Sequence, residues 1–397
     1  MTTIPSPIYI TDRVQFQDYC QQLTTYDRLA LDTEFVGEDT FVPRLELIQI
    51  ATPDFCLVID VPAVGDIGPL GESLHDPKIE KIVHAGRQDL ELFSIHTGKV
   101  PNPFFDTQIA AAMVGYGTQV AYAQLVQRVV GKRLEKAHTF TNWSRRPLHP
   151  EQVTYAAEDV QFLLAVHDHL RLKLTALGRE EWVQEEFTRF SAALQVSGQE
   201  PTPRWQRIRG WESLKPRTAA VLRELVGWRE QEARRRNVPR GRVVRDEVLV
   251  ELARRPPKDL SGLKATRGLH PSEIDRSGET ILSAIRQGRE CPDDQLPVLP
   301  AQKKPEPEAA GQVDLLQAVL KARASDLAIA PSLLASASDL QELVEAKGDR
   351  EQLEVPLLRG WRRDLAGTLL LQVLRGAVTV SIDPSSGRIV MSDSVST

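Results

Sequence analysis

Two acidic side chains lie two residues apart in an otherwise apolar stretch near the start of the chain. Asp32 and Glu34 fall within "RLALDTEF" (residues 28–35), whose alternating pattern is typical of a β-strand. Side chains two apart on a strand point to the same face of the sheet. Acids inside an apolar segment are costly unless they are paired or bind a cation. The spacing therefore predicts that both carboxylates act on one common ligand.

Two further acids lie on segments predicted to be helices. Asp89 follows the short apolar strand "KIVHAG" (81–86), and Asp159 follows Tyr155 by four residues, which places both on one helix face. Oxygen ligands suit hard divalent cations such as Mg²⁺ and Mn²⁺, and four carboxylates are enough to hold two ions about 4 Å apart for phosphoryl transfer. Taken alone, Asp89 is typical of a helix cap and Asp159 of a solvated helix face. The ordered set of four acids, together with Tyr155, favours a catalytic site over these structural roles.

The elements that would position these residues are predicted as a mixed sheet flanked by helices, an α/β arrangement. Residues 28–60 have the pattern of three strands in an antiparallel meander. Strand and helix patterns then alternate: "FFDTQIAAAMVG" (104–115) is predicted as a helix, and one long helix is predicted from Pro150 to Gly178. A further helix over 180–197 completes this first block.

Later segments are predicted to be all-α. Residues 205–287 have only helical patterns, and a linker rich in Pro and Ala precedes a third helical block. The tail fits a hairpin around Pro384–Gly387. We therefore expect three domains, over residues 1–200, 204–290 and 312–376, followed by a tail over residues 377–397.

Charge is unevenly distributed although the net charge is only −5. Residues 1–203 hold 17 Lys+Arg against 27 Asp+Glu, whereas residues 204–289 hold 21 against 11. The basic block favours binding to a polyanion such as nucleic acid; a solvated basic face is the alternative. Residues 290–397 are acidic, which argues against strong nucleic-acid binding there, and we expect that block to pack against the other domains.

Several classes of protein are disfavoured by what the sequence lacks. No apolar run approaches the roughly 20 residues of a membrane-spanning helix, and we find no secretion signal and no Gly-rich phosphate loop. The three cysteines form no CxxC pair. We therefore expect a cytoplasmic protein with reduced cysteines and no membrane partner.

Four segments together resemble the ordered motifs of the DEDD exonucleases, in the variant with Tyr-x-x-x-Asp in the last motif: "LALDTEF", "KIVHAGRQDLELF", "FFDTQIAAAMVG" and "RPLHPEQVTYAAEDVQFLL". Within that superfamily the chain is most similar to the ribonuclease D family, over residues 8–190 and on into the helical blocks. The resemblance implies an RNase H-like exonuclease domain followed by two helical HRDC-like domains, the second degenerate. It also implies metal-dependent 3′–5′ exonuclease action that releases nucleoside 5′-monophosphates.

The same resemblance assigns roles to individual residues. Asp32, Glu34, Asp89 and Asp159 are expected to bind two divalent metal ions, Mg²⁺ or Mn²⁺. Tyr155 is expected to position the attacking water, because a tyrosine with a pKa near 10 is a poor base at neutral pH. Asp106 is expected to anchor a loop or support the metal ligands. Nine further residues are expected to contact the substrate: His84, Gln88, Lys136, Trp143, Arg145, Arg146, Arg235, Arg236 and Arg240.

The function favoured by these observations is that of a monomeric 3′–5′ exoribonuclease acting on RNA with a free 3′ end. Precursor tRNAs in tRNA 3′ maturation, or other stable RNAs, are the expected substrates. Two alternatives stay open: a DNA exonuclease of the same fold, since the carboxylates do not read the 2′-hydroxyl, and a non-catalytic nucleic-acid-binding protein. The complete set of Asp32, Glu34, Asp89, Tyr155 and Asp159 argues against the second alternative.

Overall fold

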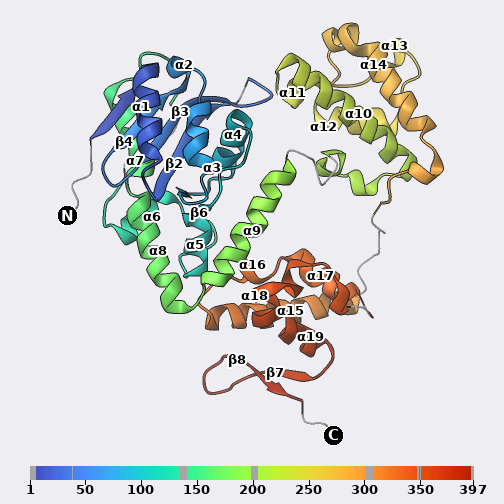
Figure 1. Cartoon of the computed structure of the whole chain (residues 1–397). Helices are drawn as coiled ribbons and strands as arrows, with labels where there is room; N and C mark the ends of the chain where they lie inside the picture. Colours follow the sequence, from blue (N-terminus) through green and yellow to red (C-terminus); the bar gives the residue numbers. More distant parts are fainter. Residues whose placement is uncertain are drawn as a thin grey trace.

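The computed structural model describes residues 6–37, 39–134, 141–197, 204–299, 307–346, 348 and 350–394. Three blocks follow one another along the chain (Figure 1): residues 6–197 around a mixed sheet, the helical residues 204–299, and a second helical block from residue 307 that ends in a hairpin. In the part of the chain that is described, no helix combines the length and apolar character needed to cross a membrane.

Six strands form the sheet of the first block, in the spatial order β1-β4-β3-β2-β5-β6. They are β1 (Pro7–Ile10), β2 (Arg28–Val36), β3 (Arg44–Ala51), β4 (Cys56–Asp60), β5 (Glu80–Val83) and β6 (Phe104–Asp106). β2, β3 and β4 pair antiparallel, which confirms the predicted meander. β5 and β6 extend the sheet in parallel, and β1 pairs in parallel with β4. The sheet is therefore mixed, as expected.

Two strands were not predicted. β1 is only four residues long, and the residues of β6 were assigned to a helix. Phe104 and Phe105 are buried, and Asp106 at the end of β6 caps the helix that follows it. The segment is therefore a strand followed by a helix rather than one continuous helix.

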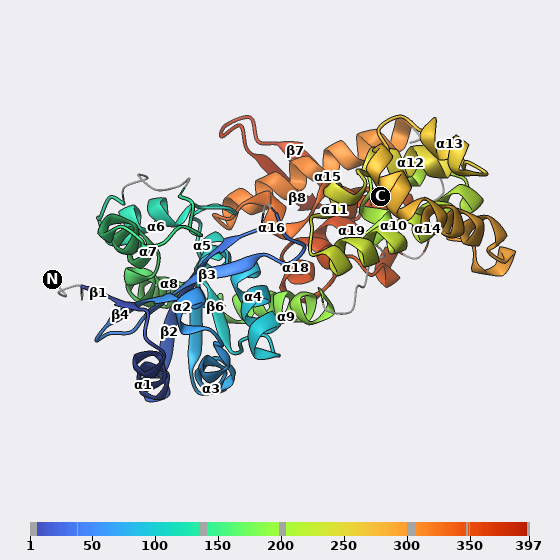
Figure 2. The same ribbon diagram turned by 90° about the horizontal axis from the view of Figure 1, so that it is seen from above.

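Helices cover both faces of the sheet. Those of the first block are α1 (Arg13–Leu23), α2 (Val61–Val64), α3 (Gly71–His75), α4 (Arg87–Thr97), α5 (Thr107–Met113), α6 (Tyr122–Val129), α7 (Pro150–Gln161), α8 (Leu163–Leu177) and α9 (Glu180–Ser197). Figure 2 shows α7 and α8 on one side of the sheet and α1 and α3 on the other. The predicted long helix is divided at Phe162, whose φ of −106° and ψ of −4° interrupt the helical path.

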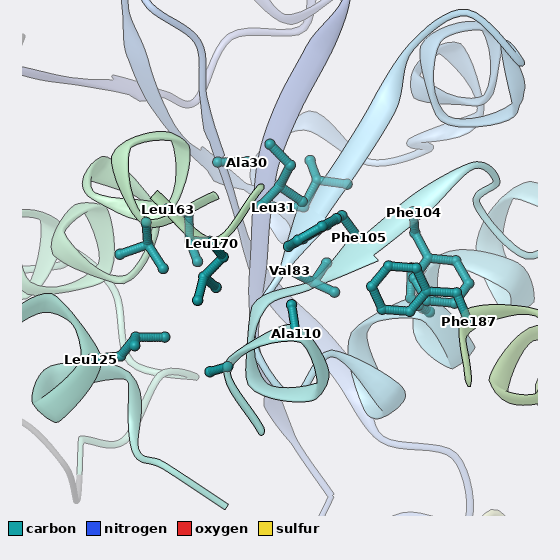
Figure 3. Close-up of a cluster of buried hydrophobic side chains, with 14 of the residues drawn as sticks. Ala30, Leu31, Val83, Phe104, Phe105, Ala110, Leu125, Leu163, Leu170 and Phe187 are labelled. Atoms are coloured by element: carbon teal, nitrogen blue, oxygen red, sulfur yellow. The ribbon is translucent and has the colours of Figure 1, made fainter. Parts of the chain in front are cut away.

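A buried apolar cluster fixes the position of β2. Leu31 of β2, Val83 of β5 and Phe105 of β6 meet Leu170 of α8 and Phe187 of α9 in this cluster (Figure 3), and all five side chains are buried. A shift of β2 by one residue would move its apolar side chains out of the core and its acids into it. Burial of Leu31 therefore determines the face on which the acids next to it lie.

The second block has a hydrophobic core of its own. Its helices are α10 (Pro216–Arg236), α11 (Arg240–Val243), α12 (Asp246–Arg254), α13 (Leu260–Lys264) and α14 (Pro271–Glu290), with 3₁₀ turns at Arg204–Arg207, Trp211–Ser213 and Asp293–Gln295. The described residues between 205 and 287 include no strand, in agreement with the sequence pattern.

The third block packs on the first and shares its core. Its helices are α15 (Pro307–Asp326), α16 (Pro331–Leu334), α17 (Ala337–Glu345), α18 (Gly360–Arg362), the π-helical turn Arg363–Gly367 and α19 (Thr368–Leu374), with 3₁₀ turns at Arg350–Gln352 and Pro356–Leu358. Trp361 stacks on Trp182 of α9 with ring centroids 5.3 Å apart. Arg362 forms a buried ion pair with Glu186, also on α9. In the tail, β7 (Val378–Ile382) pairs antiparallel with β8 (Ile389–Asp393).

Candidate active site

Three carboxylates come together where α7 packs against β2. Asp32 and Glu34 lie on one face of β2, and Asp159 lies on α7. One carboxylate oxygen from each lies within 4.8 Å of the others. The sequence prediction that these three acids share a common ligand site therefore agrees with their geometry.

Asp89 lies beside this group and not in it. It occupies the first turn of α4, is buried, and accepts a hydrogen bond from the hydroxyl of Thr33. Thr33 points to the opposite side of β2 from its two acidic neighbours because side chains alternate along a strand. The structure therefore adds Thr33 as the residue that orients Asp89. The alternation of side chains along the strand predicts the direction of the Thr33 side chain, but nothing in the sequence predicts that Asp89 is its partner.

The turn that presents Asp89 is held by Asp106. The Asp106 carboxylate accepts hydrogen bonds from the backbone N–H groups of Ala85 and Gly86 at 3.2 and 3.0 Å, and it also caps α5. A Cβ at Gly86 would lie 2.5 Å from the Cβ of Val83, so this close turn requires glycine. The expected anchoring role of Asp106 is confirmed by these contacts.

Trp143 links the acids to Tyr155. Its indole N–H donates a hydrogen bond to the Glu34 carboxylate, and its ring stacks on Tyr155 with centroids 6.3 Å apart at 25°. The side chain is only 6% exposed. This geometry makes Trp143 a positioning residue for both Glu34 and Tyr155. Its predicted contact with substrate stays a prediction.

His84 braces the turn between β5 and α4. Burial lowers its pKa to about 4, so the ring is neutral at pH 7. Nε2 lies 3.0 Å from the Val120 carbonyl, which can only accept, so Nε2 carries the single ring proton. Nδ1 lies 2.9 Å from the Thr107 hydroxyl, which itself donates to the Val83 carbonyl. The neighbouring Gln88 is exposed in the first turn of α4. Substrate contacts of both residues stay predictions.

Two arginines before α7 differ in their surroundings. Arg146 pairs with Asp60 and donates to the Trp143 carbonyl, so it braces the segment that carries Trp143. Arg145 is exposed, and among the described residues its guanidinium has no ion pair. Lys136 lies outside the described residues. Of the two described arginines, Arg145 is therefore the one whose guanidinium is available to a phosphate.

The predicted arginines of the second block are engaged in ion pairs within it. Arg235 pairs with Glu232, and Arg236 pairs with Glu232 and with buried Glu273. Arg240 pairs with Glu230 through two hydrogen bonds of 2.6 and 2.7 Å. These three residues remain predicted contacts, but each would have to share its charge with a carboxylate of its own domain.

Burial and mutual repulsion raise the pKa values of the clustered carboxylates. Burial, followed by the charges of Asp89, Asp159 and Glu34, raises the pKa of Asp32 well above its usual range. Burial and then the charges of Asp159 and Asp89 raise the pKa of Glu34 to about 8. Burial raises the pKa of Asp159 to about 7, with a contribution from Glu158. A cluster of acids with raised pKa values is typical of sites that bind cations or do acid–base chemistry.

This donor set fits a hard divalent cation. All the converging side chains offer carboxylate oxygens, the ligands that Mg²⁺ and Mn²⁺ prefer, and none offers sulfur. A bound cation would also neutralise the repulsion that raises the pKa values. The site thus belongs to the metal-dependent type expected of an exonuclease fold.

Comparison with known proteins agrees with this geometry. The chain matches the family model described as 3′-5′ exonuclease over residues 7–175 and that of the HRDC domain over residues 218–285. It is 40% identical to ribonuclease D of Granulibacter bethesdensis, covering 96% of this chain and 95% of that protein. It is 36% identical to ribonuclease D of Pseudomonas paraeruginosa, covering 94% and 99%. The crystal structure of Escherichia coli RNase D superposes with a TM-score of 0.82 at 31% identity, covering 93% of this chain and 98% of that one.

A mixed-sheet exonuclease domain with clustered carboxylates, followed by an HRDC domain, defines a hydrolytic 3′–5′ exonuclease. The relatives match it over nearly their whole length. The chain belongs to the ribonuclease D family, and it is a 3′–5′ exoribonuclease. The non-catalytic alternative is therefore dropped.

Proposed function

We propose that Asp32, Glu34 and Asp159, together with Asp89, hold two divalent metal ions, Mg²⁺ or Mn²⁺, at the 3′ end of an RNA. The observation that carries this proposal is the convergence of three carboxylate oxygens within 4.8 Å, on elements whose positions the core fixes. When bound, the ions supply an acidified water and stabilise negative charge on the phosphate that is attacked. Hydrolysis releases a nucleoside 5′-monophosphate and leaves a new 3′-hydroxyl.

The side chains of this chain orient the reaction. Tyr155 lies one helical turn before Asp159, and its phenol would align the attacking water with the terminal phosphodiester. Trp143 limits the freedom of both Tyr155 and Glu34. Glu34 would also accept a hydrogen bond from the terminal 3′-hydroxyl, which would select a free 3′ end. The exposed guanidinium of Arg145 is suited to a backbone phosphate.

We further propose that the substrates are structured RNAs, with precursor tRNAs as the first to test. Support comes from the Escherichia coli relative, which is described as an exoribonuclease involved in structured RNA processing and which matches 93% of this chain. The basic second block supplies the positive charge that such an RNA requires. A monomeric state and a cytoplasmic location stay predictions from the sequence.

The experiment that tests this function is digestion of RNA labelled at its 3′ or 5′ end, beside a DNA of the same sequence, in Mg²⁺, Mn²⁺ or EDTA. We expect immediate release of labelled mononucleotide from the 3′ label, a descending ladder from the 5′ label, and no cleavage in EDTA. Cleavage of DNA as fast as RNA would contradict the RNA preference. Cleavage in EDTA would contradict the metal assignment.

Replacement of one carboxylate tests the residue assignment. Asp159→Asn preserves size but removes a charge from the cluster, so we expect turnover to fall by at least about a thousandfold while the melting temperature stays unchanged or rises. Asp314→Asn, an exposed substitution on α15, is the matched control and should behave as wild type. Substantial activity of the purified Asp159→Asn protein would refute the proposed ligand set.

A further inference from the structure

The loop between β2 and β3 extends from the exonuclease domain to the second block (Figure 1). Phe41 in this loop packs against the hydrophobic core of the second block. Its ring centroid lies 4.4 Å from the guanidinium carbon of Arg240 and 5.1 Å from that of Arg234. The Phe41 backbone N–H donates to the side-chain oxygen of Asn237 at 3.2 Å, and Arg242 pairs with Asp39. We call these loop contacts the Phe41 latch.

The receiving side of the latch is rigidly built. Asn237 ends α10 in the left-handed conformation, with φ of +48°, and its amide oxygen is directed to the incoming loop. Arg240 is fixed by its paired hydrogen bonds to Glu230, so its planar guanidinium forms a defined surface for the Phe41 ring. The ion pair that engages Arg240 within its own domain thus prepares it to hold the exonuclease loop.

Arg240 also lines a pocket rich in arginine. This arginine pocket has a volume of about 420 Å³, and its charged lining residues are Arg204, Arg207, Arg229, Arg240, Arg245, Asp246 and Glu247. Arg204 pairs with Glu230 at 3.5 Å; burial lowers the pKa of Arg204, and the charges of Arg240 and Arg207 lower it further against the attraction of Glu230. Arg207 and Arg245 are exposed, and neither has an ion pair within the described residues. Arginine in such a setting suits phosphate groups.

We propose that the Phe41 latch holds the arginine pocket at a fixed position relative to β2, so that one RNA occupies the pocket and the carboxylate cluster together. The pocket would bind a backbone phosphate upstream of the 3′ end. Phe41 lies seven residues after Glu34, so the same strand carries catalytic acids and leads to the latch. Phe41 is thereby a positioning residue for long substrates. This inference rests on the proposed function of the carboxylate cluster.

The physical gain is one of effective concentration. An RNA held at the pocket presents its 3′ end to the cluster without a second diffusional encounter, provided that the two sites keep a distance the RNA can span. If the second block were free to move, the distance between the two sites would vary, and no single RNA length would be favoured. The latch therefore predicts that KM falls at one characteristic RNA length, which is the length needed to reach the pocket.

The test is a length series of single-stranded RNAs, cleaved by the full chain and by Phe41→Ala. For wild type we expect KM to fall by about tenfold or more once the RNA reaches the pocket. For Phe41→Ala this fall should be lost, while kcat and KM for the shortest RNA stay unchanged. Phe41→Tyr keeps the ring and should restore the fall. Val42→Ala, an exposed change in the same loop, is the matched control.

A second set of variants links the latch to the pocket. Arg207→Glu/Arg245→Glu should also remove the fall in KM, and combining it with Phe41→Ala should add little, because both act on the same second contact. Additive losses, or a Phe41→Ala protein with the wild-type length dependence, would overturn the proposal. Failure of wild type to cleave even the shortest RNA would instead refute the proposed function, so the two failures are distinguishable.

Discussion

Trp143→Phe isolates one hydrogen bond at the candidate site. Phenylalanine keeps an aromatic ring against Tyr155 but has no N–H to donate to the Glu34 carboxylate. A hydrogen bond to a charged group contributes about 1.5–3 kcal/mol. If this bond orients Glu34 for the reaction, its full loss lowers kcat/KM by about 10- to 150-fold. We expect the fall mainly in kcat, because substrate binding also uses phosphate contacts elsewhere.

The assay is single-turnover cleavage of a short RNA, so that contacts with the second block do not contribute. The concentration of Mn²⁺ that gives half-maximal rate should rise in Trp143→Phe, because Glu34 is less well oriented. Trp182→Phe, which alters a ring stacked on Trp361 and not a ring at the cluster, controls for the general effect of losing an indole. A Trp143→Phe protein within twofold of wild type in both rate and Mn²⁺ requirement would refute the argument.

Two further variants test how the fold holds the site. Arg362→Met removes the buried cation of Glu186 and leaves it only the largely exposed Arg189, so it should destabilise the protein by up to about 3 kcal/mol in denaturant unfolding at pH 7. Burial raises the pKa of Glu186, but Arg362, with smaller contributions from Arg189 and Trp361, outweighs burial and lowers that pKa below 4.5. The stabilisation is therefore complete above pH 4.5 and is lost as the pH falls through the lowered pKa, so the difference between variant and wild type should shrink in acid. A difference independent of pH would contradict this. Gly86→Ala places a Cβ 2.5 Å from that of Val83, so it should lower the free energy of unfolding by about 1–3 kcal/mol and reduce kcat by displacing Asp89. Gly227→Ala, in open space on α10, is the control and should change neither stability nor kcat. Equal melting temperatures and rates for the two variants would show that the turn can adapt.

Strong local patterns predicted much of the fold. The strands of the meander alternate or are continuously apolar, and the helix over 180–197 has clear helical spacing, so both were found. β6 was missed because three residues are too short to show a strand period before the helical pattern of α5 begins. The break at Phe162 contains neither Pro nor Gly, so the helical spacing continues across it and conceals it.

Parts of the candidate site that depend on local sequence spacing were predictable. Contacts between residues far apart in the sequence were not. Asp32 and Glu34 share a face by strand geometry alone, and the structure brings Asp159 to them. The hydrogen bond between Thr33 and Asp89 joins residues 56 positions apart, which no local pattern can reveal. Likewise, the positive charge of Arg236 was visible in the sequence, but its buried partner Glu273 was not.

The core shared by the first and third blocks sets an order for synthesis of the chain. Trp361 and Arg362 of the third block complete the packing on α9, which ends at Ser197. A ribosome adding 5–20 residues per second needs about 10–35 s to proceed from the end of α9 to the end of α19. During that interval the face of α9 around Trp182 lacks its partners from the third block. A nascent chain therefore holds an incompletely packed nuclease until the third block emerges, and chaperones or early aggregation would act on that face.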